Sequence, residues 1–266
     1  ELSERLKTFV IVRSVTRLSH ASGTVELGPL PEGSRHARFE CSGPLLDFQK
    51  GPMVTGPGVV GYARTLQLSR LREAAAAFDE SPFNTYTGPV KPDLLIITSS
   101  ACGLYSREAV EVMGLGDRVG VLRLGTTWPL PPRLMSEHLR RTDAVLVVEE
   151  PQDFLEDSVK IFAAEHAASL GTKTFYGKRS GHVPYAGELS CDLVIDALAK
   201  VLGLTHEAVP KDYADRALAS LFASPARELT FCAGCPHRAS FLALHNALAL
   251  AGRDGFVCGD VGCYTM

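Results

Sequence analysis

Four short apolar runs, separated by stretches in which apolar residues recur at helical spacing, constrain the fold of this chain most strongly. The apolar runs cover residues 93–98, 120–124, 144–149 and 172–176. Helices are predicted over 106–113, 132–141 and 154–170. Solid apolar strands that alternate with amphipathic helices indicate a parallel sheet with helices on both faces. Residues from about 92 to 178 are therefore predicted to form an α/β domain of flavodoxin-like size.

The segments before this block follow other patterns. Residues 9–12 are a continuous apolar, β-branched run, which predicts a buried strand. Residues 22–58 are rich in Gly and Pro and show little periodicity, which is typical of a long connection. Apolar residues at steps of three and four then predict a helix over 59–79.

After the block, a loop leads to a predicted helix over 191–202, and residues 203–228 are interpreted as a linker. The last part of the chain begins with a CxxC motif. A helix over 239–251 and a strand over 255–260 are predicted to follow it, as at the start of another α/β domain.

Composition and charge exclude several classes of protein. The chain has 266 residues, of which 45% are hydrophobic and 21% charged, and its net charge is −3. This charge provides no basic field for nucleic acid or an anionic membrane. No apolar run approaches the roughly 20 residues that span a bilayer, and no signal peptide is recognisable. We expect a cytoplasmic protein, and the abrupt ends at Glu1 and Met266 predict an internal fragment of a longer chain.

The seven cysteines fall into two groups, and their odd number argues against a disulfide framework. Cys41, Cys102 and Cys191 stand alone, as small buried hydrophobic residues do. The other four lie close together in the sequence, at Cys232, Cys235, Cys258 and Cys263.

A CxxC turn lets the thiolates of Cys232 and Cys235 point to one centre. One helix and one strand would then return the chain to the same edge, where the later cysteines can meet them. An iron–sulfur cluster, structural zinc, a redox dithiol and unliganded thiols all remain compatible with this spacing. His237, directly behind the motif, could cap the helix, contact a phosphate or lie on the surface.

Several stretches together resemble the α subunits of indolepyruvate:ferredoxin oxidoreductases, within the thiamine-diphosphate-dependent 2-oxoacid:ferredoxin oxidoreductase group. The matching stretches are VIVRSVTRLSH, SPFN, VLRLGTTWPLPPRL, TDAVLVVEE and GELSCDLV, and the most specific are FCAGCPHRASF and GDVGCYT. The resemblance implies an α/β fold in which a transketolase C-terminal-like parallel-sheet domain is flanked by partial thiamine-diphosphate-binding domains.

The resemblance also implies domain boundaries. They are a tail of the pyrimidine-binding domain (1–30), a linker with a helix (31–91), the transketolase C-terminal-like α/β domain (92–204), a second linker (205–228) and the truncated start of the diphosphate-binding domain (229–266).

The implied reaction is the oxidative decarboxylation of an aryl pyruvate of the indolepyruvate type to an aryl-acetyl-CoA, with reduction of ferredoxin. The implied cofactors are thiamine diphosphate, Mg²⁺ and [4Fe–4S] clusters. The implied partners are a β subunit in a hetero-oligomer, ferredoxin, CoA and the 2-oxoacid. The activating glutamate and the Mg²⁺ motif are expected outside this sequence. No catalytic residue is therefore assigned here, and the fragment alone is expected to be inactive.

The resemblance assigns the cysteines. Cys232, Cys235 and Cys263 match positions that bring thiolates to a cluster, whereas Cys258 is interpreted as a strand residue. The second hypothesis is a non-catalytic assembly fragment. In it, the transketolase-like domain forms a subunit interface, and a cysteine cluster that includes Cys258 binds zinc.

The resemblance also assigns four further residues. His237 and Gly262 would face the diphosphate, His237 at a helix start suited to an anion and Gly262 by allowing close backbone approach. Arg13 and Arg17 flank the end of the first predicted strand, where an arginine of related enzymes meets the substrate carboxylate. A guanidinium group can bind a carboxylate through two hydrogen bonds; an ordinary salt bridge is the alternative.

Overall fold

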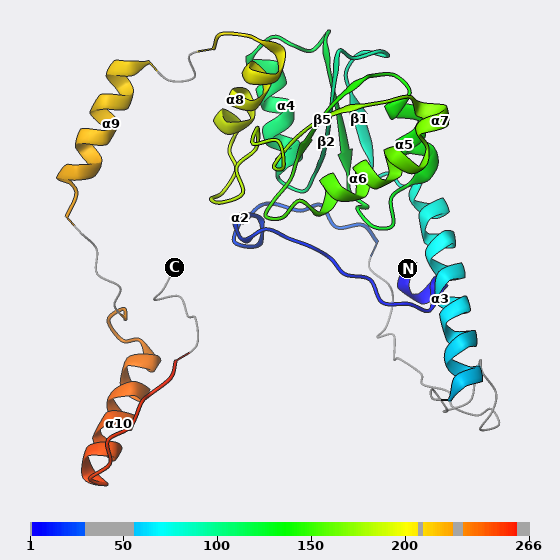
Figure 1. Cartoon of the computed structure of the whole chain (residues 1–266). Helices are drawn as coiled ribbons and strands as arrows, with labels where there is room; N and C mark the ends of the chain where they lie inside the picture. The colour runs from blue at the N-terminus through cyan, green and yellow to red at the C-terminus, as the bar shows by residue number, and fades with distance from the viewer. Residues whose placement is uncertain (1, 30–55, 207–209, 226–230, 260–266) are drawn as a thin grey trace. The chain divides into compact units, whose positions relative to one another are not determined.

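The structure is a computed structural model, and it describes residues 2–29, 56–206, 210–225 and 231–259 (Figure 1). The chain divides into two compact units, Glu1–Ala208 and Val209–Met266. The α/β domain lies in the first unit, and the CxxC motif lies in the second.

The first unit contains a five-stranded sheet with the strand order β1-β3-β2-β4-β5. The strands are β1 (Thr85–Thr87), β2 (Leu94–Ser99), β3 (Val119–Leu124), β4 (Ala144–Val148) and β5 (Thr174–Tyr176). Strands β2 to β5 are mutually parallel, so the predicted parallel sheet is confirmed. Strand β1 was not predicted, and it pairs antiparallel with β3, which makes the sheet mixed. A three-residue edge strand of polar residues carries too little apolar signal to be recognised.

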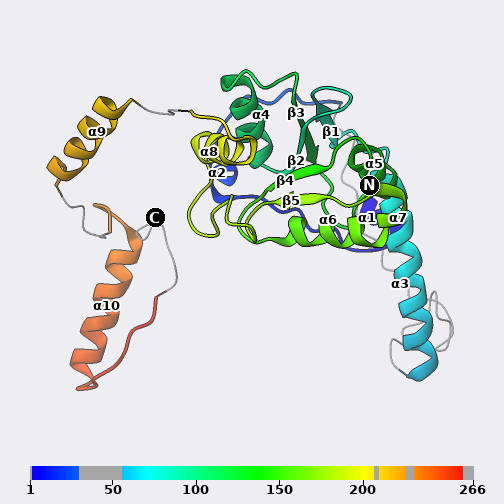
Figure 2. The same cartoon turned by 45° about the horizontal axis from the view of Figure 1, so that its top comes forward.

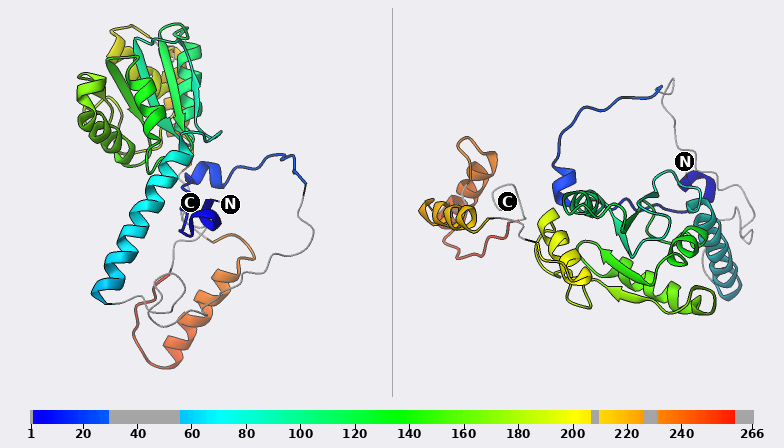
Figure 3. Two further views of the ribbon diagram at one scale, coloured as in Figure 1. Left: turned by 90° about the vertical axis from the view of Figure 1, so that its right-hand side faces the viewer. Right: turned by 90° about the horizontal axis from the view of Figure 1, so that it is seen from above.

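Helices cover both faces of the sheet, as predicted (Figure 2). On one face lie α4 (Cys102–Val112) and α8 (Cys191–Leu202); on the other lie α5 (Pro132–Leu139), α6 (Phe154–Glu165) and α7 (Ala167–Leu170). Successive strand side chains point to opposite faces. Ile96 therefore joins the core under α4 and α8, and Ile97 joins the core under α5 and α6. Figure 3 shows the sheet and the helices on its two faces from two further directions.

Helix α3 (Pro57–Phe78) matches the predicted helix before the sheet. It is joined to the domain at its end, because Oδ1 of its C-cap Asp79 accepts hydrogen bonds from the backbone N–H groups of Arg133 and Leu134, at 2.9 and 3.0 Å. The side chain of Arg133 also pairs with Glu80. Asp79 thus caps the start of α5 and fixes the end of α3 to it.

Two predicted strands are wrong. Residues 9–12, between α1 (Leu2–Leu6) and α2 (Thr16–Ser19), form no strand, and the side chain of Ile11 is 80% exposed. Residues 255–259 are likewise without a strand, and Phe256 is exposed. A strand needs a neighbour that pairs its backbone groups, and in the described ranges neither segment has one.

Several further boundaries differ from prediction: α4 begins four residues before the predicted 106–113 helix, and the predicted 154–170 helix is divided into α6 and α7. The predicted linker 203–228 contains a helix, α9 (Lys211–Ala223). Its apolar residues were a helical signal that sequence reasoning missed. Helix α10 (Pro236–Leu250) starts three residues before the predicted 239–251 helix. A proline is favoured in the first turn of a helix, because its missing N–H would have no partner there.

The buried ring of His138 on α5 makes stability depend on pH. His138 is 5% exposed, and its ring centroid lies 4.4 Å from that of Tyr86. Burial, assisted by the charge of Arg141, lowers the pKa of His138. Below about pH 6.5, the ordinary histidine value, the unfolded chain therefore binds more protons than the folded chain.

We expect the free energy of unfolding to decrease as the pH falls from about 6.5 toward the lowered pKa of His138. Urea unfolding between pH 7.5 and 5 measures this decrease. The His138→Gln variant should show a shallower decrease over the same range. An identical slope in the variant would show that other groups cause it.

Candidate functional site

The carboxyl ends of β2 and β4 form the point at which the chain changes direction across the sheet. From β2 the chain crosses by α4 to β3 on one side, and from β4 it crosses by α6 to β5 on the other. Ligands of open α/β sheets commonly bind at such a switch point.

Glu149 follows β4 at this edge, and its side chain is almost fully buried. Its carboxylate accepts hydrogen bonds from the backbone N–H groups of Leu155 and Glu156, at 2.8 and 2.7 Å. Burial has the largest influence on Glu149 and raises its pKa, while these two N–H groups act in the opposite direction. The carboxylate caps the first turn of α6, so Glu149 has a structural function in this arrangement.

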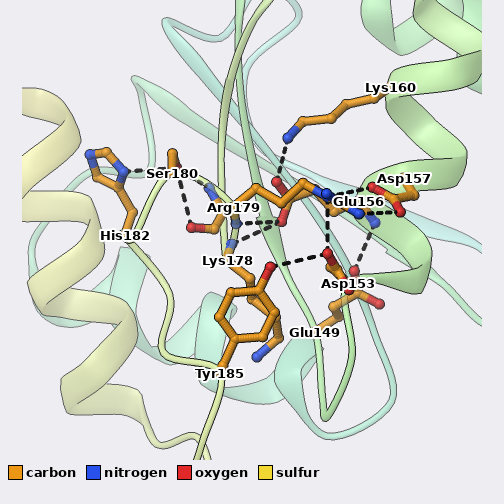
Figure 4. Close-up of polar contacts among 11 residues, drawn as sticks. Glu149, Asp153, Glu156, Asp157, Lys160, Lys178, Arg179, Ser180, His182 and Tyr185 are labelled. Atoms are coloured by element: carbon orange, nitrogen blue, oxygen red, sulfur yellow. Dashed lines mark hydrogen bonds and ion pairs between the residues drawn. The ribbon is translucent and has the colours of Figure 1, made fainter.

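The buried carboxylate of Glu156 attaches the loop after β5, residues 177–185, to α6 (Figure 4). Glu156, which is fully buried, accepts hydrogen bonds from the backbone N–H of Lys178 at 2.8 Å and from Nζ of Lys160 at 2.5 Å. A Cβ atom on Gly177 would lie only 2.5 Å from Oε2 of Glu156. Only glycine therefore allows the loop after β5 to approach this carboxylate.

A second set of ion pairs holds the same loop from the outside (Figure 4). Arg179 donates two hydrogen bonds to the carboxylate of Asp157, at 2.7 and 2.6 Å, and pairs with Asp153 at 2.9 Å. The hydroxyl of Tyr185 donates to Asp153 at 3.1 Å. Residues 177–185 are thereby fixed against the first turns of α6. Sequence reasoning missed this network; the charged cluster GKRSGH directly after a strand was its visible signal.

Cys102, the first residue of α4, lies at the switch point but is an unreactive thiol. It is 1% exposed, and burial, the largest influence, raises its pKa to about 12. The charges of Lys178 and Arg13 act against this rise. The prediction that Cys102 is a small buried residue is confirmed, Cys191 is half-buried, and Cys41 lies outside the described residues.

Arg13 lies near this carboxyl edge. Its side chain is exposed, and its positive charge acts on both Glu149 and Cys102. Arg17 is part of α2. Contact of either arginine with a substrate carboxylate stays a prediction.

The CxxC motif in the second unit forms a tight turn at the start of α10. The backbone N–H of Cys235 donates to the carbonyl oxygen of Cys232 at 3.1 Å. Gly234 supplies the left-handed backbone of this turn, with φ +76°. Sγ of Cys235, the N-cap residue, lies 3.7 Å from Nδ1 of His237.

The structure brings Cys232, Cys235 and His237 into one turn, and it leaves the rest of the predicted site untested. Gly262 and Cys263 lie outside the described residues. Cys258 is an exposed free thiol. Among the described residues, no group of three or more His, Cys, Asp or Glu side chains is arranged to hold a metal ion. The meeting of three thiols therefore stays a prediction.

Comparison with known proteins identifies relatives along the entire chain. It is 32% identical to "Indolepyruvate oxidoreductase subunit IorA" of Thermococcus kodakarensis, over all of this chain and 39% of that protein. It is 33% identical to the subunit of the same name from Archaeoglobus fulgidus, over all of this chain and 40% of that protein. The whole chain is related to IorA. It spans about two fifths of the length of these IorA proteins.

The other comparisons are less informative than the similarity to IorA. No family model matches the chain. Two similar solved structures are a split-gene transketolase (TM-score 0.35, 19% identity, 46% of this chain and 42% of that chain) and a 2-oxoglutarate:ferredoxin oxidoreductase from Magnetococcus marinus (TM-score 0.39, 13% identity, 57% and 24%). Neither likeness is close enough to support a conclusion about function. Within the described ranges, no helix is long and apolar enough to cross a bilayer.

Proposed function

We propose that this chain is part of an enzyme that oxidatively decarboxylates an aryl 2-oxoacid of the indolepyruvate type. The products are an aryl-acetyl-CoA and CO₂, and the two electrons reduce ferredoxin. The observation that carries the proposal is the similarity to archaeal IorA proteins, at 30–33% identity across the entire chain. The proposed assembly is a hetero-oligomer with a β subunit, and CoA and ferredoxin are the other partners.

The CxxC turn has the donor chemistry that an iron–sulfur cluster requires. Two thiols leave one turn at the start of α10, and thiolate sulfur is the ligand that such clusters prefer. Cys232 and Cys235 would hold the cluster together with Cys263. When bound, a cluster accepts and passes single electrons.

The start of α10 also fits a phosphate group. No side chain in the described ranges caps its first turn, which favours an anion at the positive end of the helix dipole. His237 and Gly262 would hold the diphosphate of thiamine diphosphate there, and Mg²⁺ would be held by residues outside this sequence. When bound, thiamine diphosphate stabilises the carbanion that decarboxylation leaves.

In this proposal, the arginines of the first segment bind the carboxylate of the 2-oxoacid and orient its ketone. The test of the function uses the full-length protein, purified with its β subunit without oxygen. Indolepyruvate, CoA and oxidised ferredoxin should together yield a thioester and reduced ferredoxin. Thioester formation from pyruvate or 2-oxoglutarate but not from any aryl pyruvate would contradict the proposed substrate class.

Replacing Arg13 or Arg17 with alanine should raise KM for the 2-oxoacid. A charge-assisted bidentate contact contributes about 1.5–3 kcal/mol, so kcat/KM should fall about tenfold or more. Thiamine diphosphate binding should be unchanged. Arg5→Ala, an exposed arginine on α1, is the matched control. Unchanged kcat/KM in both the Arg13 and Arg17 variants would contradict the assignment.

A further inference from the structure

The first turn of α4 lies directly over a pair of polar side chains at the carboxyl edge of the sheet. Thr98 of β2 and Arg123 of β3 are register partners on neighbouring parallel strands. A Cβ atom on Gly103, in the first turn of α4, would lie 2.6 Å from Cδ of Arg123. The aliphatic part of Arg123 therefore runs against the backbone of this turn, and only glycine leaves room for it.

Thr98 points toward the same turn. Two residues before it, Ile96 packs in the core with residues of α4, and strand residues two apart share one face. Thr98 is fully buried, and within the described residues its Oγ1 has no hydrogen-bond partner. A buried hydroxyl without a partner is costly, and such groups often mark the place of a water, an ion or a ligand.

Arg123 is a second polar group for which the described part of the chain supplies no partner. Its side chain is half-buried, and no hydrogen bond or ion pair joins it to another described residue. Arg118, at the opposite edge of the sheet, differs, because it pairs with Asp93 at 2.8 Å. Arg123 therefore presents a positive charge beside the start of α4 that no described side chain pairs with directly, although the carboxylates of Glu149 and Glu150 lie near enough to act on Cys102.

The start of α4 also lacks the acceptor that its neighbours have. Asp79 caps α5, Glu149 caps α6 and Ser190 caps α8, whereas the N-cap of α4 is Ala101. Local carbonyl groups accept from residues 103–105, but the aligned peptide dipoles still favour an anion here.

The turn into α4 contributes one more hydroxyl. Ser100 is exposed, and its φ of +55° lies in the left-handed region, which non-glycine residues rarely adopt. Backbone in such a conformation is common where proteins bind ligands.

We propose that the start of α4 binds a small oxyanion, the phosphate or carboxylate group of a ligand. Arg123 is its counter-ion, with two N–H groups available to two oxygen atoms. The hydroxyl of Ser100 donates from the rim, and Thr98 supplies a hydrogen bond from below. The site belongs to the sheet domain, and it is independent of the decarboxylation proposed above.

The experiment uses the whole chain, labelled with ¹⁵N, and two probes, sodium phosphate and sodium acetate. Each is titrated at constant ionic strength maintained with sodium chloride, and amide shifts of residues 100–104 are followed. Saturable shifts of these residues with phosphate, acetate or both support the site, and the stronger probe identifies the ligand chemistry. No saturable shift with either probe overturns the proposal.

Variants then decide which groups bind. Arg123→Gln retains most of the stem but removes the charge, so the dissociation constant should rise about tenfold or more. Arg118→Gln is the control, and its dissociation constant should equal that of the wild type. Thr98→Val has the same shape without the hydroxyl; it should fold at least as stably and bind the probe more weakly. Unchanged binding in Arg123→Gln overturns the proposal.

Discussion

Serine in place of Cys235 should abolish nearly all ferredoxin reduction by the proposed assembly. The structure places this thiol at the N-cap of α10, in one turn with Cys232. Replacing groups that only support metal ligands already lowers metal affinity or activity by about 10–100-fold. If Cys235 is a cluster ligand, as proposed, its removal should therefore reduce the rate by at least about a hundredfold. The measurements are ferredoxin reduction and the iron, sulfide and zinc content of the purified protein.

Cys258→Ser is the matched control for this result. Cys258 is exposed and lies outside the proposed ligand set, so its variant should retain both iron and activity. If the wild type contained zinc without iron, and if Cys258→Ser lost that zinc, the cluster would be contradicted. The same result would support the alternative, a non-catalytic assembly fragment with a zinc-binding cysteine cluster.

Alanine in place of Glu156 should destabilise the sheet domain by about 3 kcal/mol. The variant leaves the backbone N–H of Lys178 and the ammonium group of Lys160 without their acceptor. Removing one partner of a fully buried ion pair costs about 3–5 kcal/mol. The side chain of Lys160 is 29% exposed, so water can compensate part of the loss and we expect the lower end of this range. Urea unfolding measures the difference.

The chain offers a close comparison for Glu156. Glu137 of α5 and Arg141, two residues after the end of that helix, form another pair four residues apart, but the side chain of Glu137 is 51% exposed. Exposed pairs of this kind contribute less than about 1 kcal/mol, so Glu137→Ala should destabilise far less. Equal losses in the two variants would mean that the burial of Glu156 has no energetic importance.

The sequence predicted structure best where a strand is buried on both faces and its own residues are therefore all apolar. Strands β2 and β4 are apolar on both faces, so their runs are continuous and predict a parallel sheet. Residues 9–12 show the same apolar pattern but form no strand. The sequence identifies an apolar segment, but it does not show whether another strand lies beside it to pair with its backbone. Strand β1 is the opposite case, because it pairs with β3 but has no apolar run that would identify it as a strand.

The candidate sites show the same division. The turn between Cys232 and Cys235 follows from adjacent residues and could be predicted. The grip of Glu156 on Lys178 joins residues 22 positions apart, and the contact of Gly103 with Arg123 depends on how α4 packs on β3. Such contacts form only when the chain folds, and the residues around one partner do not identify the other.

The capping of α5 by Asp79 gives α3 a mechanical property. A helix of 22 residues is about 33 Å long, and this one is joined to the sheet domain at its last turn. A tilt of about 5° at that joint would displace the first turn of α3 by about 3 Å. Small rotations of the sheet domain would therefore be magnified at the far end of α3, and the stiffness of the joint would depend on Asp79, on the Arg133–Glu80 pair and on the hydrogen bond from Asn84 to the carbonyl oxygen of Phe78.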